Sequence, residues 1–238
     1  MNQAHFHADL SARTAHERAY LLAAPAIGRC LAGDVTRALY VEFLTQAFHH
    51  VRHTVPLLMG VGARLPDRLG WLRGEIVHYL EEEAGHDEWI LNDIVAAGGD
   101  RETARLSMPA HATDAMVAYA WDTVQRRDPV GFFGMVHVLE GTSVALALDA
   151  ADRIQHVLDL PDRAFTYLRS HGRLDREHVE HLAGILARLT EPDDREAVVR
   201  CARAIYRLYG DVFRGLDASA DGSDAPHAST AANARHAA

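Results

Sequence analysis

The sequence contains no lysine, because all 24 of its basic residues are arginine. This absence excludes a Schiff-base lysine, a pyridoxal-phosphate anchor and a P-loop lysine. Cysteine is scarce as well, and Cys30 and Cys201 are the only two. Neither a disulfide framework nor a cysteine-ligated zinc or iron–sulfur site can be built from them.

Long apolar runs and an excess of basic charge are also missing. No run of 18 apolar residues appears, so we expect no membrane span. The first ten residues lack the basic and then apolar pattern of a signal peptide, which makes the cytoplasm the expected location. The net charge of −9, from 24 basic and 33 acidic residues, gives no electrostatic basis for nucleic-acid binding. Sixteen histidines stand out in this carboxylate-rich chain.

Hydrophobic periodicity predicts an all-α protein. Apolar residues recur three and four positions apart, and alternating β-branched runs are absent. After a short helical start at 10–22, we expect helices at 35–61, 66–97, 110–127, 129–158, 162–171, 174–189 and 192–216, a bundle of about seven. Asp34 is the expected cap of the second segment, Pro56 its kink, and Gly98 the end of the third.

The domain organisation is simple. Residues 1–216 show no internal repeat or linker and are expected to form a single helical domain. Residues 217–238 lack large apolar side chains and are rich in Ala, Ser, Asp and Gly. We expect this segment to be a disordered tail.

One stretch combines carboxylates with an imidazole at helical spacing. In YLEEEAGHDEW, Glu83 precedes His86 by three residues and Glu82 precedes it by four. Either carboxylate can face the same way as the imidazole if the segment is one helix. Taken alone, such acidic residues are more often a solvated helix face.

A second stretch carries three polar residues on one stripe. His171, Asp175 and His178 lie at positions i, i+4 and i+7, an arc of roughly 60° on a helix. This holds if the helix runs back through Gly172. The alternative is a helix junction in which Asp175 is a cap.

A third stretch places a carboxylate in apolar surroundings. Glu140, with His137 three residues before it, lies in the middle of VGFFGMVHVLEGTSVALALDA. A carboxylate buried among such side chains is costly unless a charge partner compensates it. Since lysine is absent, the partner is an arginine or a metal ion. His137 is either a core histidine or a substrate contact, and His49, His50 and His53 either line a pocket or pack ordinarily.

Together these stretches supply three carboxylates and three imidazoles, and no thiolate. Such mixed oxygen and nitrogen ligation suits iron or manganese, and carboxylates can bridge two ions. The pattern therefore predicts a dinuclear iron site inside a helical bundle, with manganese as an alternative.

In the order and spacing of these elements, residues 10–215 resemble the heme-oxygenase-like diiron oxidases. Their superfamily also holds thiaminase II, pyrroloquinoline-quinone synthase and the chlamydial death-domain-associating protein. The resemblance implies a heme-oxygenase-like bundle, often a homodimer, in which two irons activate dioxygen to oxidise a small organic molecule. It also implies the ligands, which are Glu83, His86, Glu140, His171, Asp175 and His178.

The chain departs from its relatives at three positions. Some members place the first carboxylate two turns before its histidine, where this chain has Tyr79, so Glu83 or Glu82 must serve. The lysine used by the death-domain-associating protein is replaced by Ala150. Neither Cys30 nor Cys201 lies in the motif helices, which argues against the cysteine chemistry of thiaminase II.

Three alternative functions remain open at this stage. The first is a metal-free enzyme like pyrroloquinoline-quinone synthase, in which histidines move protons. The second is a non-enzymatic binding or regulatory bundle. The third is a ferritin-like carboxylate bundle, against which His171 argues as an additional imidazole one turn before Asp175.

Overall fold

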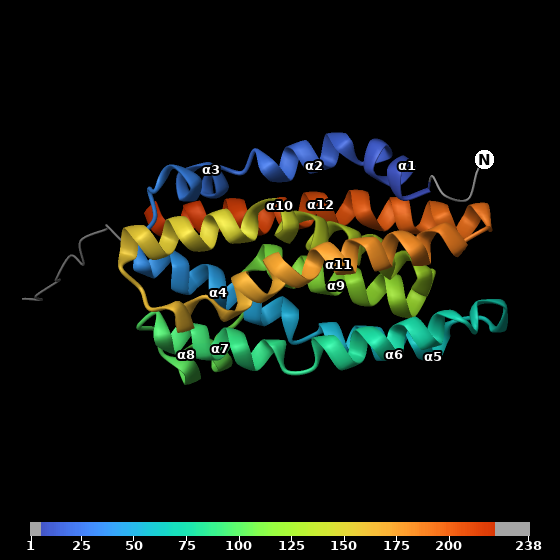
Figure 1. Cartoon of the computed structure of the whole chain (residues 1–238), viewed down its shortest axis with the longest axis horizontal. Coiled ribbons are helices and arrows are strands. Elements are labelled where there is room, and N and C mark those ends of the chain that lie inside the picture. The colour runs from blue at the N-terminus through green and yellow to red at the C-terminus, as the bar shows by residue number, and fades with distance from the viewer. Residues whose placement is uncertain (1–5, 222–238) are drawn as a thin grey trace, which may run out of the picture.

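The computed structural model describes residues 6–221, with the side chains of residues 171–177 and 217–221 excepted. Within this range the chain is helical and contains no strand, which confirms the all-α prediction. The fold is a bundle elongated along the helix axes (Figure 1).

The helices follow one another through short connections. The first half of the chain comprises α1 (Phe6–Arg13), α2 (Ala15–Leu22), α3 (Pro25–Ala32), α4 (Arg37–Val51), α5 (Thr54–Arg64), η2 (Asp67–Leu69), α6 (Leu72–Glu83), α7 (His86–Ala96) and α8 (Arg101–Leu106). The second half comprises α9 (His111–Arg126), η3 (Pro129–Gly131), α10 (Phe132–Leu158), η4 (Asp162–Ala164), α11 (Thr166–Arg188) and α12 (Pro192–Asp221).

Short helices lie end to end and line up with the long ones. In Figure 1, α1, α2 and α3 follow one another along one side of α12, and α5 to α8 form the opposite edge of the bundle. The long helix α10 lies between them, and its most extensive contacts are with α11 and α12. α10 also contacts α3 and α9.

The expected count of about seven helices is wrong for the described residues, because two long predicted segments are interrupted and further short helices form at Pro25–Ala32 and Arg101–Leu106. The segment 35–61 breaks after Val51 and resumes at Thr54. The ring of Pro56 opposes the carbonyl of Arg52, four residues earlier, which cannot stay in a regular helix. The cap is Thr36 rather than Asp34, because its hydroxyl accepts from the Leu39 N–H at 3.1 Å.

At the other end of the chain, two predicted helices are one. α11 runs without interruption from Thr166 to Arg188, through Gly172, so the condition for a shared stripe of ligands is met. α12 continues five residues past the predicted domain boundary, to Asp221. The rest of the predicted tail lies outside the described residues.

The hydrophobic core has two clusters, and α10 contributes to both. Phe132, Phe133 and Val138 belong to the first cluster, together with residues of α5, α6 and α12. Ala147 and Ile154 belong to the second, together with residues of α4, α7 and η4. Glu140 lies between these two stretches of α10.

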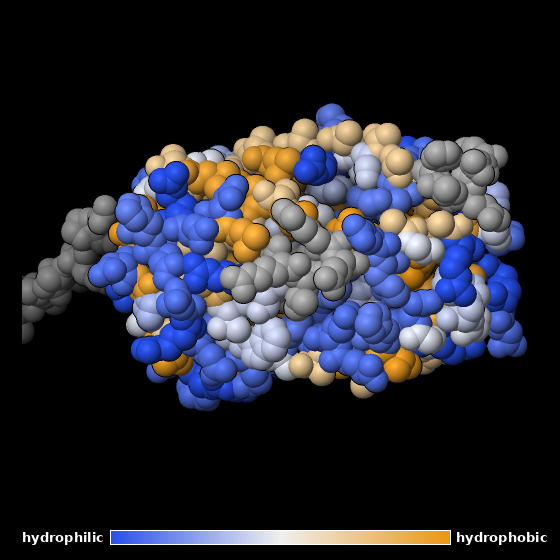
Figure 2. Space-filling model, in the orientation of Figure 1, coloured by the Kyte–Doolittle hydropathy of each residue, from blue (hydrophilic) through white to orange (hydrophobic). Residues whose placement is uncertain are grey.

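The segment Pro129–Leu158 is long and apolar enough to cross a membrane by length and composition, with a mean hydropathy of 1.5 over its most apolar window. The absence of a long, wholly apolar run therefore did not exclude such a candidate. In the structure 67% of that window is buried inside the protein, as in the core helix of a soluble domain. Hydrophilic side chains cover much of the visible surface (Figure 2).

Candidate metal centre

Glu83 and His86 lie on either side of a helix break. Glu83 is the last residue of α6 and His86 the first of α7, so the prediction of one helix carrying both is wrong. Gly85 adopts a left-handed conformation with φ of 91°, which favours glycine and ends the helix. The two side chains still meet, because His86 Nδ1 lies 3.1 Å from Glu83 Oε2.

On the opposite side, α11 brings His178 to α6. The His178 side chain is buried, and its Nε2 lies 3.3 Å from Glu82 Oε2. The other oxygen of Glu82 lies 3.3 Å from Nε2 of His78, which is more exposed. Each of the two candidate first carboxylates therefore reaches a different histidine, Glu83 reaching His86 and Glu82 reaching His178.

Tyr79 is the buried residue that connects these groups, and only 2% of it is exposed. Burial and the charge of the nearby Glu140 carboxylate raise the pKa of its hydroxyl far above the usual value, and the charges of Glu82 and Glu83 add to the shift. Its ring lies 6.4 Å from that of His178. Three carboxylates thus surround one protonated hydroxyl.

Glu140 projects from the middle of α10 and is 8% exposed. It lines a cavity of about 170 Å³ together with Glu83 and Tyr79. None of the described residues lining the cavity is an arginine, and the chain has no lysine. Buried carboxylates next to imidazoles, without thiolates, are a donor set that fits iron.

The structure therefore brings four predicted ligands to one region, namely Glu83, His86, Glu140 and His178. The side chains of His171 and Asp175 lie outside the described residues. Within the described part of the chain, no group of three or more His, Cys, Asp or Glu has the geometry of a metal site. The continuous backbone of α11 puts residue 175 about one turn and residue 171 about two turns before His178.

Several polar residues at this site escaped the sequence analysis. His181 Nε2 lies 3.3 Å from Glu75 Oε2, and Arg188 Nη1 lies 2.7 Å from the other oxygen of Glu75. The spacing of Glu75, Tyr79 and Glu82 along one helix face is the signal that could have found them. These residues tie α6 to α11 beside the buried carboxylates.

The remaining candidate histidines divide between the cavity and the core. His50 lines the cavity, whereas His49 Nε2 lies 2.8 Å from the Ser107 hydroxyl. The indole N–H of Trp121 donates to His53. His137 is buried next to Tyr206, and burial lowers its pKa to about 4. It is therefore a neutral core histidine near neutral pH.

The two cysteines are not activated. Cys30 lines the cavity, and burial raises the pKa of its thiol. Cys201 is buried in α12, where desolvation raises its pKa to about 12. A lowered pKa favours a nucleophilic thiol, and burial shifts the pKa of both cysteines in the opposite direction.

Comparison with solved structures identifies the architecture. A Shewanella denitrificans domain of unknown function with a heme oxygenase-like fold superposes with a TM-score of 0.84 at 24% identity, covering 95% of this chain and 98% of that one. A TenA homolog from Pseudomonas syringae gives 0.73 at 10% identity, covering 88% and 91%. Heme oxygenase-1 from Synechocystis, in complex with heme, gives 0.72 at 12% identity, covering 94% and 96%.

Sequence comparison identifies the family. No curated protein matches the chain. The model of the family of iron-containing redox enzymes, which is of heme oxygenase type, matches residues 41–210. This match spans more than half of the chain and includes the residues of the site described above. The chain therefore belongs to the family of iron-containing redox enzymes with a heme-oxygenase-like fold.

Proposed function

We propose that this protein is a non-heme diiron oxidase or oxygenase, which uses dioxygen to oxidise a small organic substrate. The observation that carries the proposal is the gathering of carboxylates from α6 and α10 around the buried hydroxyl of Tyr79, with His86 and His178 in contact with two of them. Membership of a family of iron-containing enzymes supports the same assignment.

The metal would be held by Glu83, His86, Glu140, His171, Asp175 and His178, with Glu82 as the alternative first carboxylate. Bound iron supplies the electrons that reduce dioxygen and the oxidising power that acts on the substrate. Manganese has similar ligand preferences, and affinity alone does not separate the two metals. In either case the cation balances the carboxylate charge that is buried here.

The residues of the chain have distinct tasks in this proposal. Tyr79 stays protonated, so its hydroxyl can donate to the Glu140 carboxylate and fix its orientation. Glu82 lies 3.3 Å from His178 Nε2 and would help to orient that ring. The apolar walls of the cavity keep bulk water away from the reacting centre.

The decisive experiment compares iron content in variants of two candidate ligands. His86→Ala and His178→Ala should each lose at least half of the iron retained after anaerobic reconstitution with ferrous iron, while circular dichroism remains that of a folded bundle. His111→Ala, at an exposed position at the start of α9, is the matched control and should keep full iron content. Exposing the loaded protein to air should then consume dioxygen.

Two outcomes would contradict the proposal. Unchanged iron content in both variants would remove the site, and a folded wild-type protein that binds no transition metal would favour a metal-free enzyme like pyrroloquinoline-quinone synthase. We also propose that the enzyme is a homodimer, as the family resemblance implies, and that it acts in the cytoplasm, the location expected from its sequence. Sedimentation velocity of the same samples separates a dimer from the 26.2 kDa monomer.

A further inference from the structure

The buried carboxyl group of Asp93 contacts the start of α11, the helix that carries three of the predicted ligands. Asp93 belongs to α7 and is 0% exposed, and its Oδ2 accepts from the backbone N–H of Tyr167 at 2.8 Å. Tyr167 is the second residue of α11, and Phe165, which precedes the helix, makes no side-chain cap. The first N–H groups of a helix have no partner within it. Asp93 therefore caps α11 from a neighbouring helix.

Asp93 also lies on a helix that begins with a predicted ligand. His86 is the first residue of α7, and Asp93 follows it by two helical turns, about 10 Å along the axis. Residues at this spacing share a helix face, and both side chains are buried. The hydrogen bond between Asp93 and Tyr167 therefore joins the helix of His86 directly to the helix of His178.

A second contact between the same segments lies on the other side of the site. Glu82, in the last turn of α6, has its Oε2 at 3.3 Å from Nε2 of His178. Asp93 follows Glu82 by eleven residues, and His178 follows Tyr167 by eleven residues as well. The two segments therefore run in opposite directions between two contacts that are equally spaced in sequence. Between these contacts along the chain lie the other predicted ligands of the two segments, which are Glu83, His86, His171 and Asp175.

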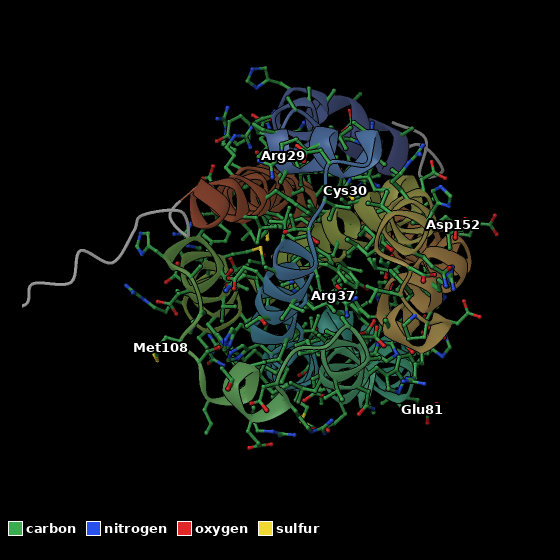
Figure 3. The ribbon with its side chains drawn as sticks, turned by 90° about the vertical axis from the view of Figure 1, so that its left-hand side faces the viewer. Arg29, Cys30, Arg37, Glu81, Met108 and Asp152 are labelled. Carbon is green, nitrogen blue, oxygen red and sulfur yellow. The ribbon has the colours of Figure 1, made fainter. Side chains whose placement is uncertain are left out.

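The outer side of the same turn of α11 is held by exposed groups. Arg169 pairs with Asp152 at 3.1 Å and with Asp162 at 3.0 Å, and both carboxylates are largely exposed. Figure 3 looks onto this end of the bundle, where Asp152 extends outward from α10. Exposed ion pairs contribute little, because solvent screens them. The hydrogen bond of Asp93 is shielded from water and should hold this turn more firmly.

We propose that Asp93 is a positioning residue of the metal centre, which caps α11 from α7 and thereby fixes the ligand stripe of α11 opposite Glu83 and His86. Its carboxyl group acts through the backbone of α11 and does not bind the metal. This inference rests on the proposed function, because it assigns a role in that site. An asparagine at position 93 would keep an oxygen that can accept the Tyr167 N–H, whereas an apolar residue would not.

Gln46 provides a matched control, because it caps another helix in the same way. Its side-chain oxygen accepts from the Ala110 N–H at 2.9 Å and from the Thr113 hydroxyl at 2.7 Å, at the start of α9. Gln46 belongs to α4 and is 4% exposed, and α9 carries none of the predicted ligands. Gln46→Ala therefore removes a buried cap from a helix outside the proposed site.

The experiment compares wild type, Asp93→Ala, Asp93→Asn and Gln46→Ala at pH 7 by anaerobic titration with ferrous iron and by amide hydrogen exchange of the metal-free protein. Loss of a helix cap changes a local equilibrium about fivefold. Asp93→Ala should therefore bind iron at least about fivefold more weakly. The amides at the start of α11 should exchange about fivefold faster in this variant.

The other variants should separate position from stability. Asp93→Asn should stay within about twofold of the wild type in both measurements. Gln46→Ala should keep the iron affinity of the wild type, and its faster exchange should lie at the start of α9. If Asp93→Ala does not fold, Asp93→Leu removes the acceptor without opening a cavity.

Equal losses of iron affinity in Asp93→Ala and Gln46→Ala would show that Asp93 acts through overall stability, and would overturn the proposal. Unchanged iron affinity in Asp93→Ala would do the same, as would a loss in Asp93→Asn as large as that in Asp93→Ala. Hydrogen exchange separates this inference from the proposed function. A wild type that binds no iron would refute the diiron proposal, whereas unchanged exchange of α11 in Asp93→Ala, with iron bound by the wild type, would refute this inference alone.

Discussion

The two halves of α10 differ in how closely they are packed. In the first half, a Cβ added at Gly134 would lie 2.3 Å from the Val198 carbonyl oxygen and 2.7 Å from the Ala202 nitrogen, so the backbones of α10 and α12 touch. In the second half, Ala147 and Ala150 face a cavity. Small residues therefore have two different effects within one helix. They allow close contact in the first half and leave space in the second half.

Glu140 stands at the boundary between these halves. The close-packed half fixes the position of the helix, because it leaves no room for sliding against α12. The open half can then leave space beside the carboxylate without loss of position. The comparison indicates that a buried polar site needs a rigid support on one side and accessible volume on the other.

The largest effect is expected from closing the contact in the first half. Gly134→Ala should lower the free energy of unfolding by about 3 kcal/mol or more, because its methyl group meets backbone atoms that cannot move alone. Chemical denaturation measures the loss. The matched control is Gly141→Ala, where nothing lies within 4 Å of the added Cβ. It should be neutral or raise the free energy of unfolding by about 0.5–1 kcal/mol.

Equal stability of Gly134→Ala and the wild type would show that the helices are not in contact at this point. The two halves of α10 would then not differ as described.

The extent of α10 and the burial of Glu140 could be predicted from sequence. Pro129 marks the start of the segment, and a carboxylate among apolar residues is visible without a structure. The break at Gly85 could not be predicted, because glycine is also tolerated within helices, as at Gly172 in α11. Which of these two glycines interrupts a helix depends on packing against the rest of the bundle.

The cavity was also beyond the reach of the sequence. Its walls come from α3, α4, α10 and α12, and one sequence does not show which faces of distant helices meet. The approach of the carboxylates to Tyr79 could not be predicted for the same reason, because α6 supplies the hydroxyl while α10 supplies Glu140. The residue types could be selected, but their common centre required the fold.

A smaller effect concerns the wall of the open half. Tyr167 lines the cavity, and its N–H donates to the buried carboxylate of Asp93 at 2.8 Å. Burial raises the pKa of Asp93 to about 6. The native state therefore holds this proton more tightly than the unfolded chain does, and stability falls as the pH rises from about 4 to 7.

This pH dependence can be removed by substitution. An asparagine amide does not titrate, so the free energy of unfolding of Asp93→Asn relative to the wild type should increase by about 2 kcal/mol between pH 4 and 7. Urea denaturation at several pH values measures the difference. If the free energies of unfolding of the two proteins changed with pH in parallel, Asp93 would be ionised throughout this range. The hydrogen bond from Tyr167 would then not hold a protonated carboxyl at the cavity wall.

The smallest effect is expected beyond the bundle. Removing residues 222–238 should change the free energy of unfolding by less than about 0.5 kcal/mol, because this segment lacks large apolar side chains that could be buried. Thermal unfolding of the shortened chain checks this. A clear loss of stability would place part of the segment against the bundle, and the comparison of the two halves would have to include it.

The division of α10 has a consequence for how such proteins diversify. Gly134 lies against the backbone of α12, so a larger residue there would cost stability. Ala147 and Ala150 line the cavity, and exchanging either methyl group for a larger side chain alters which molecule fits without disturbing the contact of Gly134 with α12. A lineage carrying this helix can therefore explore new ligands through single changes while the buried carboxylate of Glu140 is inherited intact.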